Sequence, residues 1–315
     1  MNVPVIDAIA IGRNEGERLL ACLNSLKGQV RRLIYVDSGS SDGSVAAAQA
    51  LGAEVIQLDM SLPFTAARAR NAGLAALDDD NELVQFVDGD CQVDPGWIAR
   101  ATDFLLQNPK AAVVCGRRRE RFPEASVFNR LCDQEWDTPL GEAKACGGDA
   151  LMRVAALRQV KGYRDDLIAG EEPELCVRLR HAGWTIWRLD AEMTLHDAQM
   201  LRLAQWWKRS RRAGYAFAQG ANLHGAPPER HWVTETRRAL LWGVVLPIGV
   251  IFGLTLSIWA ILAILIYPLQ LWRLSRRMGP EQALFSVLGK FPEAQGALEF
   301  YWHRLRGKQR DILEY

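Results

Sequence analysis

The first half of the chain alternates short apolar runs with segments that repeat apolar residues at helical spacing. Residues 5–11 form an apolar run rich in β-branched side chains, whereas residues 17–26 carry leucines along one face of a helix. Short apolar runs separated by helices of this length predict an α/β fold, with a mostly parallel sheet covered by helices on both sides. The expected strands are 5–11, 33–36, 54–58, 83–87 and 111–115, and the expected helices are 17–26, 44–51, 65–77 and 95–108.

Polar residues gather where these strands end. In sheets of this class, ligands bind at the carboxyl ends of the strands, on the loops that follow them. The sequence therefore predicts a binding site along that edge. Its candidate residues are Arg13, Asn14 and Glu15 after the first strand, Asp37 and Asp42 after the second, and Asp88 and Asp90 after the fourth.

Asp88-Gly89-Asp90 is the sharpest of these signals. Two carboxylates separated by one small residue can offer oxygen ligands to Mn²⁺ or Mg²⁺, and such a cation neutralises a nucleotide diphosphate leaving group. A solvated acidic turn is the alternative, but the position at the end of a strand favours the metal site. His196, which precedes Asp197, is either a further ligand or a structural histidine.

Asp37 and Asp42 flank a loop of glycines and serines. A carboxylate there can accept a hydrogen bond from a nucleobase or a ribose hydroxyl, although Asp42 can instead cap the helix that follows. The first strand is not followed by a Gly-x-Gly-x-x-Gly fingerprint, and the sequence has no Walker-type phosphate loop. These absences weigh against a dinucleotide-binding fold.

Glu171 and Glu172 form a second acidic signal, at the predicted start of a helix. The helix dipole favours carboxylates at that position, so capping alone is one interpretation. The functional interpretation is a general base that deprotonates an acceptor hydroxyl. Crowded carboxylates raise one another's pKa, which suits a base that works near neutral pH.

One segment departs from this pattern: residues 239–272 contain no charged side chain over 34 positions. A single helix of that length would measure about 50 Å, against a hydrocarbon core of ~30 Å. One strongly tilted helix or a membrane hairpin broken near 253–257 would fit, and arginines on both flanks favour the hairpin with both ends cytoplasmic. A buried helical pair in a soluble domain is the alternative.

Composition narrows these possibilities. The net charge of +1 provides no basic field for nucleic acid. Six scattered cysteines, without a Cys-x-x-Cys pair, indicate neither a disulfide framework nor a zinc site and suit a reducing compartment. The N-terminus lacks the basic region of a signal peptide, so we expect the catalytic part to stay in the cytoplasm.

Six ordered motifs lie within residues 3–200: IGRNEG at 11–16, VDSGSSDGS at 36–44, RARNAG at 68–73, FVDGD at 86–90, GGDALMR at 147–153 and GEEPEL at 170–175. Together they resemble the family 2 glycosyltransferases, which have the GT-A fold. The resemblance implies inverting transfer of a sugar from a nucleotide-diphosphate sugar, expected to be a UDP-sugar, to a hydroxyl acceptor.

The resemblance assigns roles to particular residues. Glu172 is the expected base, but the family usually has Glu-Asp where this chain has Glu171-Glu172, so either glutamate remains a candidate. Asp88, Asp90 and His196 are the expected metal ligands. Donor-binding residues are Asn14, Glu15, Asp37, Asp42, Arg70, Asn71 and Asp88, and acceptor-side residues are Asp149, Trp206 and Trp207.

The chain lacks the Gln-x-x-Arg-Trp motif of processive synthases, which indicates a single-addition enzyme. As a whole it resembles bacterial exopolysaccharide-assembly transferases that act on glycan or glycolipid acceptors at the cytoplasmic face of the inner membrane. A nucleotide-sugar-binding protein without catalysis and a sugar-nucleotidyltransferase are the alternatives. The expected layout is a catalytic domain at 1–200, divided near 116, a basic amphipathic connector at 201–238, the hairpin at 239–272 and a cytoplasmic basic tail at 273–315.

Overall fold

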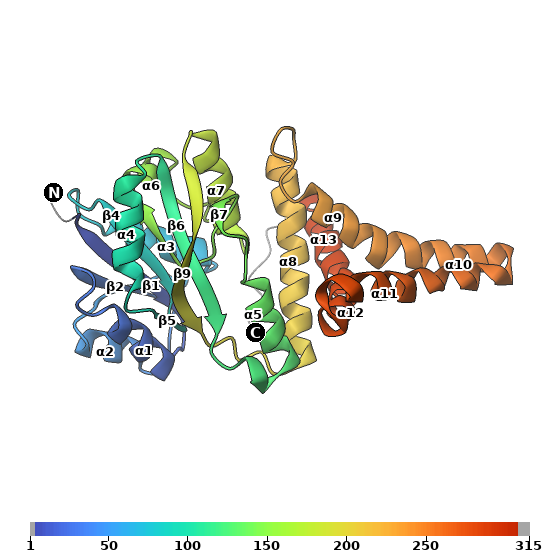
Figure 1. Ribbon diagram of the computed structural model, residues 1–315, viewed down its shortest axis with the longest axis horizontal. Coiled ribbons are helices and arrows are strands. Elements are labelled where there is room, and N and C mark those ends of the chain that lie inside the picture. The colour runs from blue at the N-terminus through green and yellow to red at the C-terminus, as the bar shows by residue number, and fades with distance from the viewer. Residues whose placement is uncertain (1–3, 308–315) are drawn as a thin grey trace. The chain divides into compact units, whose positions relative to one another are not determined.

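The computed structural model describes residues 4–307 (Figure 1). The contacts of the chain divide it into two compact units, Met1–Gln199 and Met200–Tyr315. The first unit is an α/β domain and the second is helical. Each unit is described by itself below.

The first unit contains one mixed sheet with strand order β3-β2-β1-β4-β8-β6-β9-β5, and β7 pairs with β9. Its first half, from β3 to β4, is parallel as expected, but β8 lies antiparallel between β4 and β6. Strands β6 and β9 also pair in parallel, whereas β5 and β7 run antiparallel to β9, so the sheet is mixed rather than mostly parallel. The strands are β1 (Ile6–Gly12), β2 (Arg32–Asp37), β3 (Glu54–Gln57), β4 (Leu83–Asp88), β5 (Cys91–Val93), β6 (Ala111–Glu120), β7 (Gly141–Ala143), β8 (Ala150–Arg153) and β9 (Thr185–His196).

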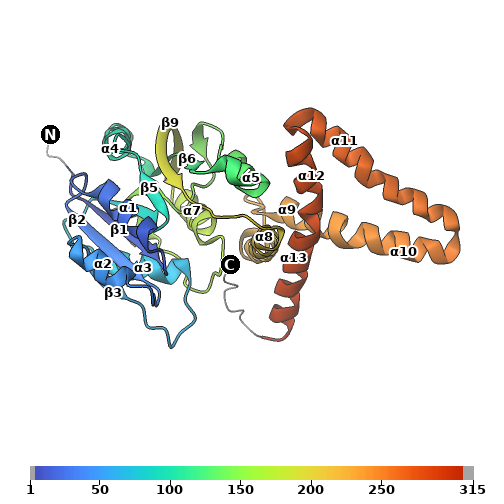
Figure 2. The ribbon, with the colours of Figure 1, turned by 90° about the horizontal axis from the view of Figure 1, so that it is seen from below.

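Helices cover both faces of this sheet (Figures 1 and 2). The helix predicted at 17–26 is observed as α1. Its buried residues recur at helical spacing and are Leu19, Cys22, Leu23 and Leu26. The helices are α1 (Glu17–Leu26), α2 (Ser44–Ala50), α3 (Ala66–Ala75), α4 (Trp97–Gln107), α5 (Val127–Glu135), α6 (Val154–Gln159) and α7 (Glu171–His181), with a 3₁₀ turn at Pro123–Ala125.

The long strand β6 was only partly predicted, and β9 is not among the expected strands. The sequence predicts a strand at 111–115, whereas β6 continues to Glu120 and α5 follows. The extension was missed because it contains Arg117, Arg118 and Arg119, which give no apolar alternation. These arginines are tolerated in a sheet because acidic side chains pair with each of them.

The second unit is helical throughout most of its described length. Residues expected to form a basic tail instead continue as helices, and α13 packs closely along α8. Glycines permit that approach: a Cβ at Gly214 would lie 1.9 Å from the carbonyl oxygen of Glu293. The elements are α8 (Leu203–His224), α9 (Val233–Leu240), a π-helical turn (Leu241–Val245), α10 (Leu246–Leu256), a 3₁₀ segment (Ile258–Leu265), α11 (Ile266–Met278), α12 (Pro280–Leu288) and α13 (Lys290–Leu305).

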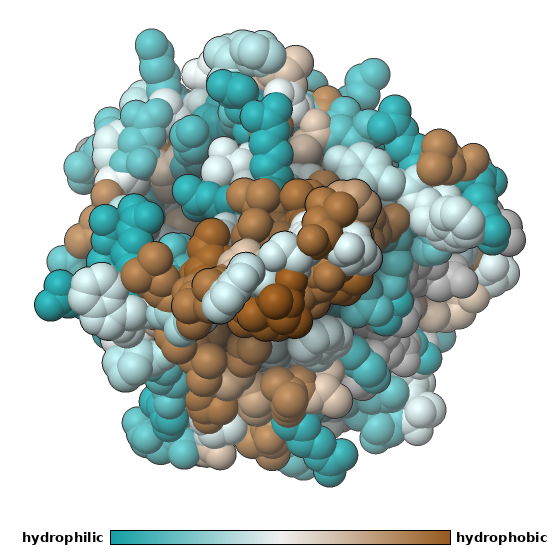
Figure 3. All heavy atoms as spheres, turned by 90° about the vertical axis from the view of Figure 1, so that its right-hand side faces the viewer, coloured by the Kyte–Doolittle hydropathy of each residue, from teal (hydrophilic) through white to brown (hydrophobic). Residues whose placement is uncertain are grey.

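The uncharged run forms two arms that double back on each other (Figures 1 and 2). Their helices, Val233–Leu256 and Ile258–Met278, are long and apolar enough to cross a membrane. The break lies at Ser257, within the expected stretch, where the backbone is extended. The most apolar windows of the two arms are only 6% and 0% buried, so they do not form the buried helical pair that was the alternative. Figure 3 shows apolar side chains gathered on the face at this end of the unit.

Candidate functional site

A group of carboxylates lies where β1 and β4 end. Glu15 follows β1, Asp88 is the last residue of β4, and Asp90 follows one residue later. Gly89 lets the two strand ends approach closely, because its N–H donates to the Ile11 carbonyl at 2.8 Å and a Cβ would lie 3.1 Å from that oxygen. The edge predicted from the sequence is therefore where these side chains meet.

Asp88 is held between two arginines. Its carboxylate accepts from Arg70 at 2.7 Å and from Arg118 at 3.4 Å. Burial raises the pKa of Asp88, and the charge of Arg70 opposes that rise. Arg118 was not among the predicted site residues, although three consecutive arginines directly after a buried strand were a signal that a charged site lies at that strand.

Asp149 lies beneath Asp88 and is fully buried. It accepts from the backbone N–H of Asp88 at 2.9 Å and from the hydroxyl of Thr194 at 2.8 Å, and it pairs with Arg118 at 2.8 Å. Its oxygens thus face other residues of the site. The contact of Asp149 with an acceptor stays a prediction, and in this structure Asp149 holds Asp88 and Arg118 in position.

Asp90 pairs with His196, whose Nε2 lies 3.2 Å from Oδ2. Burial would raise the pKa of Asp90, but the charge and hydrogen bond of His196 hold it at about 2. Burial would lower the pKa of His196, but the Asp90 carboxylate raises it to about 9. The edge of the Trp136 ring packs on the imidazole, with ring centroids 4.6 Å apart.

Further acidic side chains lie close to Asp90 and His196. Burial and the nearby carboxylate of Asp90 raise the pKa of Glu15 to about 7, although Arg18 lies 2.6 Å from it. Asp90 and His196 form one group of candidate ligand atoms with Cys91, and Asp88 and Asp149 form another with the same cysteine. Carboxylate oxygens and an imidazole beside excess negative charge are a donor set that suits Mn²⁺ or Mg²⁺.

The loop between β2 and α2 is tied together by its own polar groups. Asp37 is buried, accepting from the Tyr35 hydroxyl at 2.9 Å and from the backbone N–H groups of Gly39 and Ser40. Asn14, at a positive φ of 56°, accepts from the Ser41 N–H at 2.8 Å. These contacts give the loop a fixed shape at the edge where a nucleotide would bind.

Asp42 behaves as the capping alternative predicted. Its Oδ1 accepts from the backbone N–H of Ser44 at 3.0 Å and from the Ser44 hydroxyl at 2.6 Å. That hydrogen bond from the Ser44 hydroxyl lowers the pKa of this exposed carboxyl. The structure therefore shows Asp42 organising the start of α2, and its donor-binding role stays a prediction.

Helix α3 connects the carboxylate group to α7. Arg70 is buried and donates both to Asp88 and to Glu171, each at 2.7 Å. Asn71 faces elsewhere: its amide donates to the Tyr163 carbonyl at 2.8 Å and its oxygen accepts the Tyr163 N–H at 2.8 Å. The amide of Asn71 thus fixes the loop before α7, and its predicted donor contact stays a prediction.

The two glutamates at the start of α7 have different surroundings. Glu171 is paired with Arg70. Glu172 is 4% exposed, and its Oε1 accepts from the Cys146 N–H at 2.7 Å and from the thiols of Cys146 and Cys176 at 2.8 and 2.9 Å. Burial raises the pKa of Glu172 to about 7, against those hydrogen bonds.

The predicted acceptor-side tryptophans lie in the second unit. Trp206 is buried against Phe285, with ring centroids 5.1 Å apart, and its predicted contact with an acceptor stays a prediction. Trp207 is 38% exposed and its indole N–H donates to Gln295 at 3.2 Å. Their apolar and basic surroundings in the sequence did not distinguish a packing role from a binding role.

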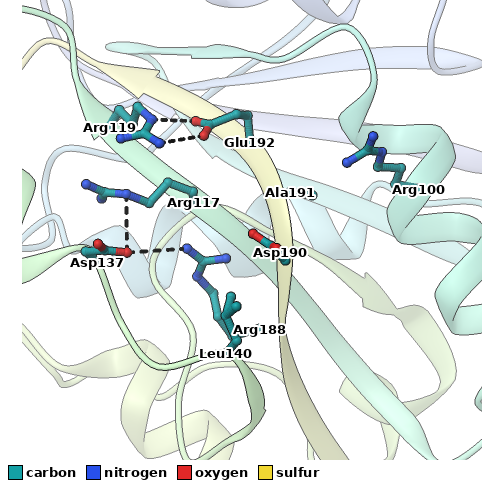
Figure 4. Close-up of a pocket in the computed structure, with 9 residues that line it drawn as sticks. All are labelled: Arg100, Arg117, Arg119, Asp137, Leu140, Arg188, Asp190, Ala191 and Glu192. Atoms are coloured by element: carbon teal, nitrogen blue, oxygen red, sulfur yellow. Dashed lines mark hydrogen bonds and ion pairs between the residues drawn. The ribbon is translucent and has the colours of Figure 1, made fainter.

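A separate polar pocket of about 310 Å³ lies along β6 and β9 (Figure 4). Whereas Arg118 points to Asp88 and Asp149, its neighbours Arg117 and Arg119 line this pocket. Carboxylates balance them, since Arg119 pairs with Glu192 at 2.7 Å and Arg117 with Asp137 at 3.5 Å. The pocket is thus distinct from the carboxylate group at the strand ends.

Residues 8–155 match the family model described as glycosyl transferase family 2. The succinoglycan biosynthesis protein ExoA of Rhizobium meliloti is 24% identical over 268 residues, which cover 75% of this chain and 79% of that protein. A pre-mycofactocin glycosyltransferase of Mycobacterium tuberculosis is 26% identical over 254 residues, which cover 76% of this chain and 52% of that protein.

Solved structures show the same fold. A mannosyltransferase from Pyrobaculum calidifontis, in complex with GDP-Man and Mn²⁺, has a TM-score of 0.69 at 16% identity, covering 96% of this chain and 89% of that one. A glucosyl-3-phosphoglycerate synthase from Mycobacterium tuberculosis, in complex with Mn²⁺, UDP and glucosyl-3-phosphoglycerate, has a TM-score of 0.52 at 20% identity, covering 71% and 81%.

Proposed function

Because the first unit contains a family 2 glycosyltransferase domain with the GT-A fold, we propose that the chain is an inverting enzyme that transfers one sugar to a hydroxyl acceptor. The donor is a nucleotide-diphosphate sugar. The carboxylate group at the ends of β1 and β4, linked by Arg70 to the start of α7, carries this proposal. It joins a site for the diphosphate to a candidate base within one connected set of side chains.

Asp88, Asp90 and His196 would hold the divalent cation, Mn²⁺ or Mg²⁺. When bound, it neutralises the negative charge that develops on the departing diphosphate. Asp149 and Arg118 fix the position of Asp88. The loop that carries Asp37 would receive the nucleoside. The bound Mn²⁺ and nucleotides of the two structural relatives support this arrangement.

Glu172 is the proposed base. Glu171 is already neutralised by Arg70, whereas no cationic side chain in residues 4–307 pairs with Glu172. The three donors on its Oε1 fix the orientation of the carboxylate. In the reaction, the acceptor oxygen bonds to the anomeric carbon, the bond from that carbon to the diphosphate breaks, and Glu172 takes the proton of the hydroxyl.

The membrane part of the proposal concerns the two apolar arms, Val233–Leu256 and Ile258–Met278. Side chains such as Ile251 and Trp259 are 66% and 74% exposed, and arginines flank the uncharged run on both sides. An apolar surface of this kind is stable in lipid, and the flanking charges favour the cytoplasmic side. We propose that residues 239–272 insert as a hairpin from that side of the inner membrane, and that the acceptor is a lipid-linked glycan.

Membrane topology can be tested with reporter fusions at Gly225 and after Tyr315, the latter beyond the described residues. Both reporters should be cytoplasmic, and the protein should resist extraction by high salt. A periplasmic reporter after Tyr315 would mean a single crossing and exclude the hairpin. Release by salt alone would mean peripheral attachment.

Transfer itself can be tested with the detergent-solubilised full chain and a panel of UDP- and GDP-sugars. Thermal shift should identify the donor, and release of nucleoside diphosphate should require Mn²⁺ or Mg²⁺. Donor binding without release, with any acceptor extract, would indicate a binding protein. Formation of a nucleotide sugar from a sugar phosphate would indicate a nucleotidyltransferase.

A further inference from the structure

A second set of metal-ligand side chains surrounds Glu172. Cys146 comes from the segment before β8, and Cys176 lies one turn after Glu172 on α7. The two sulfur atoms are 4.0 Å apart, and each lies within 2.9 Å of Glu172 Oε1. Two thiols and a carboxylate from separate segments thus converge on one point, although the sequence showed no Cys-x-x-Cys spacing.

The separations suit a tetrahedral thiophilic cation. Two thiolates bound to Zn²⁺ at about 2.3 Å lie roughly 3.8 Å apart, close to the observed distance between the sulfur atoms. A carboxylate oxygen at about 2.0 Å from the ion would lie roughly 3.5 Å from each sulfur, so Glu172 would have to withdraw by about 0.6 Å. That is within the range of a side-chain rotation.

The donor type separates this set from the carboxylates at the strand ends. Sulfur ligands select Zn²⁺ and similar ions, whereas Mn²⁺ and Mg²⁺ prefer oxygen. No cationic side chain within residues 4–307 pairs with Glu172, and a dication would supply that positive charge.

We propose that Cys146, Cys176 and Glu172 bind a thiophilic divalent cation such as Zn²⁺, with water as the fourth ligand, and that this binding inhibits transfer. Binding forms two metal–sulfur bonds and releases two thiol protons to solvent, without a change of oxidation state. The inhibition rests on the proposed role of Glu172, because an oxygen bound to the ion cannot accept the proton of the acceptor. The binding itself does not depend on that role.

Binding is best tested on the reduced, metal-free full chain with Co²⁺ as the probe and excess Mg²⁺ to occupy the oxygen site. The wild type should take up Co²⁺ with a thiolate-to-cobalt charge-transfer band, which Zn²⁺ displaces. Cys146→Ser should remove the band, because it removes one of the two thiolate ligands. The variant should still fold, because Cys146 lies in an irregular segment that tolerates serine. Cys132→Ser, in α5, is the matched control and should keep it. Absence of the band in the wild type, or its persistence in both Cys146→Ser and Cys176→Ser, would overturn the site.

Inhibition is measured separately, as the ratio of transfer rates with and without Zn²⁺ under excess Mn²⁺. We expect at least a tenfold loss in the wild type and in Cys132→Ser, and little change of the ratio in Cys146→Ser. Equal inhibition of all three proteins would place the Zn²⁺ effect elsewhere and overturn the regulatory half. If no donor supports transfer, the proposed function fails while the cobalt result still decides the metal site.

Discussion

The sheet of the first unit has carboxylates paired with basic side chains at each end of β1, and the two ends balance charge differently. At the amino end, Asp7 is fully buried and accepts from Arg31 at 2.9 and 3.0 Å and from Arg32 at 3.2 Å. Burial would raise the pKa of Asp7, but Arg31, Asn81 and Arg32 together lower it. This carboxylate is stabilised in its charged form by the fold itself.

At the carboxyl end of β1, burial outweighs the basic partners for two of the carboxyl groups. The pKa of Asp88 is raised by burial despite Arg70, and that of Glu15 is raised to about 7 by burial and by its acidic neighbour Asp90. Only Asp90, paired with His196, has a lowered pKa. The difference teaches that arginines keep the amino-end carboxylate charged as part of the fold, whereas at the carboxyl end burial and neighbouring carboxylates oppose ionisation, and a bound cation would favour the charged forms.

The largest expected effect is at the carboxyl end. Asp90→Ala should lower transfer by about 10³-fold, because it removes a metal ligand next to the developing charge. The protein should remain folded in a thermal melt, and Asp103→Ala, an exposed acid on α4, is the control with normal activity. Full activity of Asp90→Ala, or of the wild type in excess EDTA, would remove the functional distinction between the two ends.

Next in size is the effect on the proposed base. Glu172→Gln should reduce kcat by about 10²-fold with donor binding unchanged, as expected for loss of a general base. Glu171→Gln breaks the contact with Arg70 and should instead alter donor affinity. Steady-state kinetics of the two variants separate these outcomes. If only Glu171→Gln loses turnover, the base is Glu171.

The smallest effect tests the amino end. Asp7→Asn should lower the free energy of unfolding by about 2 kcal/mol at pH 7, because two charged donors lose their acceptor. A lowered pKa stabilises the fold above about pH 4 and loses that effect as the pH falls through the folded pKa, so the difference between variant and wild type should shrink in acid. Thermal melts at pH 7 and pH 3 measure this.

Asp80→Asn is the matched control, since Asp80 contacts the same Arg31 at 3.1 Å but is 62% exposed. Exposed pairs contribute about 0.5 kcal/mol or less, so its melting temperature should barely change. If Asp7→Asn also leaves the melting temperature unchanged, the pairing of Asp7 with Arg31 and Arg32 does not stabilise the fold.

The sequence by itself determined where strands end and which polar residues follow them. Because side chains alternate on strands and recur every third or fourth position on helices, the apolar pattern located β1, α1, β2 and β4 and the edge that holds Asp88 and Asp90. The ordered motifs indicated the family that residues 8–155 match. The uncharged run likewise located both arms of the hairpin and the break at Ser257.

Only the tertiary structure decided which polar residues meet. Arg118 and Asp149 come from separate segments and meet at Asp88, while Thr194 donates to Asp149, and no local periodicity encodes these contacts. The same holds for Cys146, which reaches Glu172 from 26 residues away, and for α13, which turns an expected tail into a partner of α8. Local patterns report burial along one segment, whereas hydrogen bonds and ion pairs between segments depend on strand order and register, which the whole chain sets together.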